Sequence, residues 1–174
     1  MAIILETEQL LLRHFIPDDL EELFALYRDP DIRKYFPEGV LTRDETKEEL
    51  EWHMNGHPEY PDLGLWATIH KKTRKFIGRC GLLPWEIESK LEVEIAYLLD
   101  KEFWGRGLAT EAAKGILAYG FEKLYLTRLT CLIHPHNLAS QKVAKRIGMT
   151  LERSVEGIAG DNFPTLIYSI SRQV

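Results

Sequence analysis

The 174-residue sequence has little cysteine, and it lacks a long apolar run and an excess of positive charge. Cys80 and Cys131 are the only cysteines, and both lie in apolar stretches, which predicts reduced, buried thiols. No run of about 18 apolar residues occurs, which excludes a transmembrane helix. An acid appears as early as Glu6 with no basic segment before it, so we expect no secretory signal and a cytoplasmic location. The formal net charge of -5 argues against nucleic acid as a partner.

What the sequence does contain is typical of a globular protein. Apolar residues make up 45% and charged residues 28%, which is enough apolar material to fill a core. Repeats, low-complexity segments and linkers rich in proline, glycine or serine are not apparent. We therefore expect a single domain over residues 1–174.

Hydrophobic periodicity predicts alternating strands and helices. Strands are predicted at 7–15, 65–70, 76–83, 91–99, 128–133, 149–151 and 165–171. Helices are predicted at 17–29, 42–55, 109–124 and 137–147. Thr42 with Glu45 matches a capping box, with Leu50, Met54 and Trp52 as an apolar side, and Gly148 suits a helix end.

This order predicts an α/β fold, a mixed sheet with helices on both faces. The segments 65–70 and 76–83 read as an antiparallel hairpin. The strand 91–99, the helix 109–124 and the strand 128–133 form a candidate right-handed crossover between parallel strands.

The junction between that first strand and its helix is rich in glycine. Gly105 and Gly107 let the backbone approach a bulky ligand, and a helix start presents free N–H groups to an anion such as a pyrophosphate, with Arg106 adding charge. The dinucleotide fingerprint fails because Thr110 stands in place of its third glycine, and no P-loop lysine follows. A glycine-rich turn that only caps the helix explains this segment equally well.

A second polar feature opens the short helix at 137–147. Asn137 and Ser140 are ordinary helix-start residues, so helix capping is the simple explanation. His134 and His136 form His-x-His without an evident third ligand, and no metal site is predicted.

Together these features resemble the GNAT superfamily of N-acetyltransferases. The resemblance rests on Gly105-Arg106-Gly107-Leu108-Ala109, on Asn137-x-x-Ser140 and on Gly148-Met149. The stretches 6–13, 76–78, 93–97 and 103–105 are similar to its RimJ/RimL branch, the ribosomal-protein N-terminal acetylase type, and the likeness covers nearly the whole chain.

The resemblance implies a sheet splayed between its fourth and fifth strands, 91–99 and 128–133, with acetyl-CoA in the opening. The pyrophosphate would lie on the backbone of Trp104, Gly105, Arg106, Gly107, Leu108, Ala109 and Thr110. The pantetheine arm would pair with Tyr97, Leu98 and Leu99 as an added strand does, and Asn137 and Ser140 would contact it from the other side.

The resemblance also implies direct attack of an amine on the thioester in a ternary complex, with a backbone N–H near Leu98 or Leu99 stabilising the oxyanion. Glu94 is the candidate base, with Glu92 as the second choice. The tyrosine that many members use as acid is Ala144 here, so Ser140 takes that role in the prediction.

The acceptor is expected to be a primary amine, either a protein N-terminus or a small molecule. Its cleft would include Tyr35, Phe36, Trp66, Trp85 and the loop 159–163. We expect a monomer or homodimer that does not bind a membrane. The alternative is a non-catalytic acyl-CoA sensor or scaffold of the same fold, which thiol release with mixed acceptors would distinguish.

Overall fold

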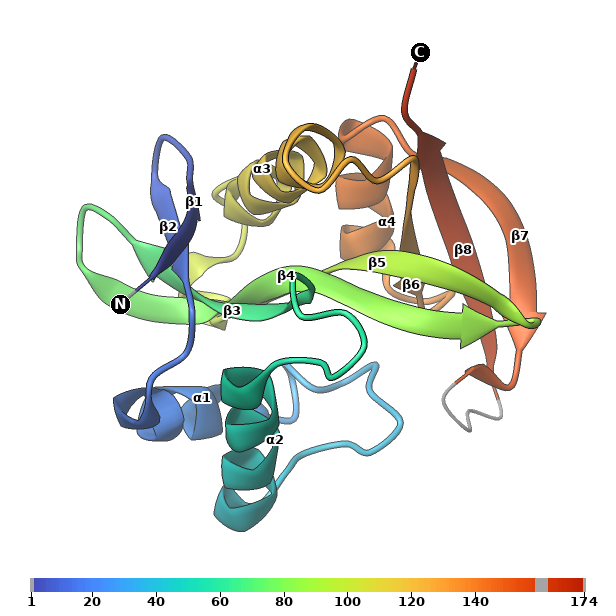
Figure 1. Cartoon of the computed structure of the whole chain (residues 1–174). Helices are drawn as coiled ribbons and strands as arrows, with labels where there is room; N and C mark the ends of the chain where they lie inside the picture. The colour runs from blue at the N-terminus through green and yellow to red at the C-terminus, as the bar shows by residue number, and fades with distance from the viewer. Residues whose placement is uncertain (1, 159–162, 174) are drawn as a thin grey trace.

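The computed structural model describes residues 2–158 and 163–173 and contains one eight-stranded mixed sheet. The strands run in the order β1-β2-β3-β4-β5-β6-β8-β7, and helices cover both faces. In Figure 1, α1 and α2 lie on one side of the sheet and α3 and α4 on the other. The predicted fold class is therefore confirmed.

The elements follow one another in the predicted alternation. The strands are β1 Ile3–Glu6, β2 Leu10–Arg13, β3 Gly64–His70, β4 Lys75–Ile87, β5 Lys90–Leu99, β6 Arg128–Ile133, β7 Thr150–Glu156 and β8 Pro164–Ser171. The helices are α1 Leu20–Tyr27, α2 Arg43–Asn55, α3 Leu108–Glu122 and α4 Leu138–Arg146, with short 3-10 turns at Pro17–Asp19 and Lys101–Phe103.

The first predicted strand, 7–15, is confirmed for Leu10–Arg13, which is β2, but it is shorter than predicted, and β1 at Ile3–Glu6 precedes it as a strand that the sequence analysis did not predict. β1 pairs antiparallel with β2, and the N–H of Thr7 donates to the carbonyl of Leu10 to close the turn between them. The Glu111 carboxylate, on α3, accepts hydrogen bonds from the Thr7 hydroxyl at 2.5 Å and the Gln9 N–H at 2.7 Å. This long-range contact holds the turn between β1 and β2 against α3.

Two further expectations need correction. On α2 the capping box of Thr42 and Glu45 forms and Leu50 is buried, but Trp52 and Met54 are exposed, so the apolar side is narrower than predicted. At the other end of the chain, β7 extends to Glu156 because β8 supplies hydrogen-bond partners along its length.

Two apolar clusters lie on opposite faces of the sheet. The larger joins α3 and α4 to side chains such as Ile95 and Leu99 of β5, and the smaller joins α1 and α2 to Leu98. Neighbouring residues of β5 therefore contribute to different cores, as the period of two requires. Both cysteines are free and buried, as predicted.

Candidate acetyl-CoA and acceptor site

The splay between β5 and β6 positions the site. These two strands are parallel, and their register contains a single pair, Glu94 with Thr130, whereas β4 pairs with β5 over ten residue pairs. Beyond Glu94 the two strands separate. A cavity of about 1480 Å³ occupies the opening and extends to the segment between α1 and α2 and to α2, α3 and α4.

The backbone of β5 turns alternate residues toward this opening. The carbonyls of Val93 and Ile95 accept from Thr130 and Cys131 of β6, so odd-numbered residues face β6. Asp100 donates its N–H to Ile77 of β4, so even-numbered residues face β4.

The N–H groups of Tyr97 and Leu99 therefore face the gap, which suits the predicted pairing with an extended ligand. Leu98 is different, because its carbonyl lies directly against the Cα of Gly78 in β4. The main chain of Leu98 therefore belongs to the β4–β5 ladder, whereas the residue lines the cavity, and its contact with the ligand stays a prediction.

The glycine junction forms one end of the cavity. Gly105 and Gly107 have φ of 73° and 76°, the left-handed region that favours glycine, and Gly107 is the N-cap of α3. Both line the cavity together with Leu108, Ala109 and Thr110, whose N–H groups belong to the first turn of α3. An anion at this end would meet free N–H donors and the positive end of the helix dipole.

Two predicted residues of this junction behave differently from the glycines. Trp104 lines the cavity, and its indole N–H donates to the Leu99 carbonyl at 2.9 Å. Arg106 is not among the lining residues, and its guanidinium lies 4.9 Å from the centre of the Phe103 ring.

Glu94 lies at the point where β5 and β6 part, and it lines the cavity. Its carboxylate accepts from the Trp85 indole at 3.1 Å and from the Leu132 N–H at 3.3 Å. Burial raises the pKa of Glu94 to about 7, although both hydrogen bonds and the charge of Arg79 act in the opposite direction. A carboxylate with this pKa exchanges protons readily near neutral pH.

Glu92, the second choice, lies outside the cavity. It is buried and accepts both Nε and Nη2 of Arg128, at 3.0 and 3.1 Å. This ion pair links β5 to β6, and it corrects the expectation that Glu92 is available as a base.

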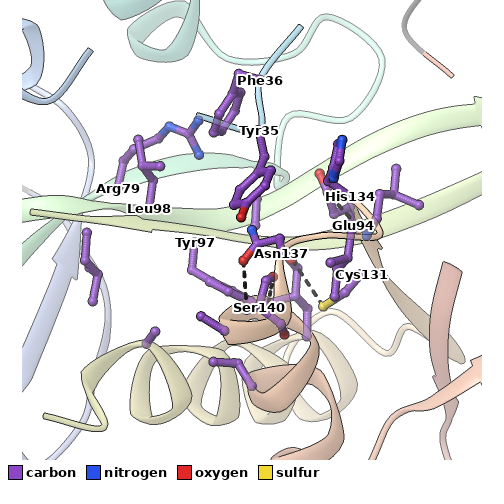
Figure 2. A pocket seen from close by; sticks show the side chains of 18 of the residues that line it. Tyr35, Phe36, Arg79, Glu94, Tyr97, Leu98, Cys131, His134, Asn137 and Ser140 are labelled. Atoms are coloured by element: carbon purple, nitrogen blue, oxygen red, sulfur yellow. Dashed lines mark hydrogen bonds between the residues drawn. The ribbon is translucent and has the colours of Figure 1, made fainter. Parts of the chain in front are cut away.

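Ser140 and Tyr97 meet on the other face of the sheet (Figure 2). Their hydroxyl oxygens are 2.8 Å apart, and the Tyr97 hydroxyl also donates to the Ser140 carbonyl at 3.0 Å. Asn137 caps α4 by accepting the Ser140 N–H at 3.1 Å, so the capping interpretation holds for its side-chain oxygen. All three residues line the cavity.

Of the expected acceptor-cleft aromatics, Tyr35, Phe36 and Trp85 line the cavity. Trp66 does not: it is 3% exposed and packs edge-on against Tyr119 of α3, on the opposite face of the sheet. The predicted loop 159–163 lies outside the described residues except for Phe163, whose ring is 5.7 Å from that of His134. Within the described ranges no group of His, Cys, Asp or Glu has a metal-binding arrangement.

Sequence reasoning missed a buried polar chain under the acceptor end. Arg79 donates its Nε to the Tyr27 hydroxyl at 2.7 Å, Tyr27 donates to Glu49, and Glu49 lies 3.4 Å from His53. The available signal was an arginine inside the apolar strand Phe76-Ile77-Gly78-Arg79-Cys80.

Comparisons with known proteins agree with this geometry. The family model described as an acetyltransferase (GNAT) domain matches residues 9–150. YkkB of Bacillus subtilis is 35% identical over 152 residues, which cover 87% of each chain. The N-acetyltransferase YnaD of the same species is 29% identical over 146 residues, covering 84% of this chain and 82% of YnaD.

Solved structures have the same fold. A GNAT-family acetyltransferase from Bacillus anthracis superimposes with a TM-score of 0.83 at 27% identity, covering 98% of both chains. RimL, a ribosomal alpha-N-protein acetyltransferase in complex with coenzyme A, has a TM-score of 0.79 at 19% identity over 98% of both chains, a likeness of fold alone.

The chain therefore belongs to the GNAT acetyltransferase family, as the resemblance predicted. It is an acetyl-CoA-dependent acetyltransferase, and acetyl-CoA is the family's cosubstrate. No helix in the described part of the chain has the length and apolar character needed to cross a membrane.

Proposed function

We propose that the protein transfers the acetyl group of acetyl-CoA to a primary amine, as an N-acetyltransferase of the RimJ/RimL type, with Glu94 as the base. The observation that carries the proposal is the Glu94 carboxyl, which lines the cavity where β5 and β6 part and has a pKa of about 7.

The residues present fit acetyl-CoA. The gap offers the main-chain N–H groups of Tyr97 and Leu99 to an extended arm. The α3 N-terminus behind Gly105 and Gly107 offers free N–H donors to a diphosphate, and nothing within 4 Å of either glycine's Cβ position obstructs access. Acetyl-CoA supplies the acetyl group as a thioester.

Glu94 would take the proton from the attacking amine, directly or through water. A free α-amino group has a pKa of about 7.7–8.0, within one unit of the carboxyl, whereas a lysine amine at about 10.4 is much harder to deprotonate. This match favours an N-terminal or similarly weakly basic amine as acceptor. The Leu99 N–H, which faces the gap, is the donor we assign to the developing oxyanion.

Ser140 is the residue that would return a proton to the departing sulfur. Its hydroxyl lies at the cavity wall, and the Tyr97 hydroxyl fixes its orientation at 2.8 Å. Burial holds the pKa of Tyr97 well above its usual range, so Tyr97 stays protonated and serves as a hydrogen-bond donor.

Release of free thiol from acetyl-CoA, measured with a panel of peptides and small amines, tests the proposal. We expect turnover with at least one primary amine and none without an acceptor. Tight coenzyme A binding without thiol release for any amine would instead identify the non-catalytic sensor or scaffold.

A further inference from the structure

Two arginines are buried beneath the acceptor end of the cavity. Arg79 projects from β4, and Arg33 comes from the segment between α1 and α2; they are 5% and 4% exposed, and both line the cavity. Figure 2 shows Arg79 reaching toward Phe36. Their guanidinium carbons lie 5.6 and 4.0 Å from the centre of the Phe36 ring.

The neighbouring groups use only part of the donors of these arginines. Arg79 donates Nε to Tyr27, and among residues 2–158 and 163–173 its two Nη groups have no hydrogen-bond partner. Neither Nη is sealed off from solvent, because the one fully buried, unpartnered side-chain nitrogen or oxygen in those ranges is His53 Nδ1. The Nη groups of Arg79 therefore keep some contact with solvent, and Arg79 is one of the residues that line the cavity.

The charges at this end do not balance. Glu49 is the inward-facing acid: hydrogen bonds from His53 and Tyr27 and the charge of Arg79 overcome the effect of burial and lower its pKa to about 2. Glu38 lies 3.7 Å from Arg33 Nη2, but its side chain is 58% exposed at the rim. Apart from Glu94, which lies farther along the cavity where β5 and β6 part, two buried guanidinium groups thus face one buried carboxylate, and a buried charge without a partner is costly.

The position of Arg79 relative to Glu94 sets the dimensions of a ligand. Arg79 pairs with Leu98 and Leu83 pairs with Glu94, so Arg79 and Glu94 share a face of the sheet. They are separated by the four steps from residue 94 to residue 98 of β5, which is about 13 Å between backbone positions at about 3.3 Å per residue. An acceptor whose amine lies at Glu94 would place a group some two to four residues along its chain near Arg79.

We propose that Arg79, supported by Arg33, selects acceptors that carry a carboxylate on the same molecule as the amine. The free Nη groups of Arg79 offer the parallel donors that a carboxylate accepts in bidentate geometry. The inference rests on the proposed function and assigns its acceptor class: acidic amines rather than polyamines. This local preference is opposite to what the net charge of -5 alone favours.

The test compares kcat/KM of the wild-type protein for matched peptides with a free N-terminus, Ser-Asp-Glu-Ala amide against Ser-Asn-Gln-Ala amide, by thiol release. We expect the acidic peptide to be favoured at least tenfold, mainly through KM, with the ratio falling as salt rises. Equal values for the two peptides would refute the inference while leaving acetyl transfer intact. Absence of turnover with every amine would refute the proposed function itself.

Variants connect the preference to Arg79. In Arg79→Met the ratio should fall below about threefold while the Kd of acetyl-CoA is unchanged, and Arg79→Lys should retain an intermediate preference. Arg43→Met is the matched control, because Arg43 is an exposed cation on α2 that pairs with Glu21 and does not line the cavity. A preference that survives in Arg79→Met, or that is lost equally in Arg43→Met, would overturn the assignment to Arg79.

Discussion

At the scale of single residues, Glu94 shows how the surroundings in a fold shift the pKa of a carboxyl toward the value that proton transfer at neutral pH requires. Removal of water favours the neutral acid, and two neighbouring N–H groups and the charge of Arg79 favour the carboxylate. Burial is the larger effect, so the pKa settles near 7 rather than near 4.5. Glu92, two residues earlier on the same strand, is neutralised by Arg128 and is structural.

The first prediction concerns turnover. Glu94→Gln should lower kcat by about 10²- to 10⁴-fold with the Kd of acetyl-CoA retained, because the amide cannot accept a proton. The wild-type rate should rise with pH through about 7, the pKa of Glu94, and the variant should lack this limb. Steady-state kinetics from pH 5.5 to 9 measure both effects.

Glu86→Gln is the control for this comparison, since Glu86 is an exposed glutamate of the adjacent strand β4 that does not line the cavity. It should retain wild-type kinetics. A Glu94→Gln enzyme with wild-type turnover and an unchanged pH profile would show that the base lies elsewhere.

The second prediction concerns stability. Because the folded state raises the pKa of Glu94 from 4.5 to about 7, it binds this proton more tightly than the unfolded chain does. The stabilisation is fully present below about 4.5 and is lost as pH rises through 7. We therefore compare the free energies of unfolding of Glu94→Gln and the wild type at two pH values. From pH 4.5 to pH 8, the difference between them should shift by about 1–3 kcal/mol in favour of the variant.

Urea denaturation of both proteins at the two pH values measures this difference. The upper limit is reduced from the full shift, because Glu94 is only half-buried. A glutamine cannot accept both the Trp85 and Leu132 hydrogen bonds, but this loss is the same at both pH values and cancels in the comparison. A pH-independent difference would mean that Glu94 titrates normally in the folded protein.

At the scale of elements, the helix start at Gly107 is the feature on which ligand binding depends most. Gly107→Val forces a β-branched residue to φ of 76°, where only a strained backbone accommodates it. The first turn of α3 should shift, and the Kd of coenzyme A, measured by calorimetry, should rise about tenfold or more.

A matched control separates strain from function here. Gly56, at the end of α2, has the same φ of 76°, and its Cβ position is likewise free of contacts within 4 Å. The ψ of Gly56 is 163°, a region almost restricted to glycine, whereas that of Gly107 is 8°, so Gly56→Val should suffer at least as much strain, without weakening coenzyme A binding. Equal affinity loss in the two variants would mean that the α3 N-terminus is not the phosphate site.

Elements with local signals could be predicted from the sequence, and elements fixed by distant contacts could not. The capping box at Thr42 and the alternation of 91–99 involve only residues that are close in the sequence. The sequence therefore predicted α2 and β5 correctly. The short strand β1 at Ile3–Glu6 was not predicted, and the turn that follows it is held by hydrogen bonds to Glu111, about a hundred positions away, which no local pattern indicates.

The same division applies to the site. Gly105, Gly107, Asn137 and Glu94 were identified because their residue types and spacing resemble the family, and the structure brings all four to one cavity. The acceptor end was predicted less well. Trp66 turns away from it, and the chain from Arg79 through Tyr27 to Glu49 joins three elements that only the folded sheet brings together.

At the scale of the whole molecule, the cavity draws its walls from both faces of the sheet. Ser140 and Tyr97 contribute from the α3 and α4 side, and Arg79 and Phe36 from the α1 and α2 side, with the β5–β6 gap between them. Such a cavity exists only when both layers are assembled. The single-domain organisation over 1–174, the cytoplasmic location and the monomer or homodimer state stay predictions.

The last prediction follows from the fact that both faces of the sheet contribute walls to the cavity. A ligand that binds only the assembled cavity stabilises the whole fold by mass action, so coenzyme A at 100 times its Kd should raise the free energy of unfolding by about 2.7 kcal/mol. The far-UV circular dichroism, which reports the sheet and helices, and the tryptophan fluorescence should shift together to higher denaturant. Trp85 and Trp104 line the cavity and Trp66 lies in the core beyond it, so the fluorescence reports both regions. Gly107→Val should lose most of this stabilisation at the same ligand concentration. Separate transitions for the two signals would mean that unfolding is not two-state and that the cavity is not built by one cooperative unit.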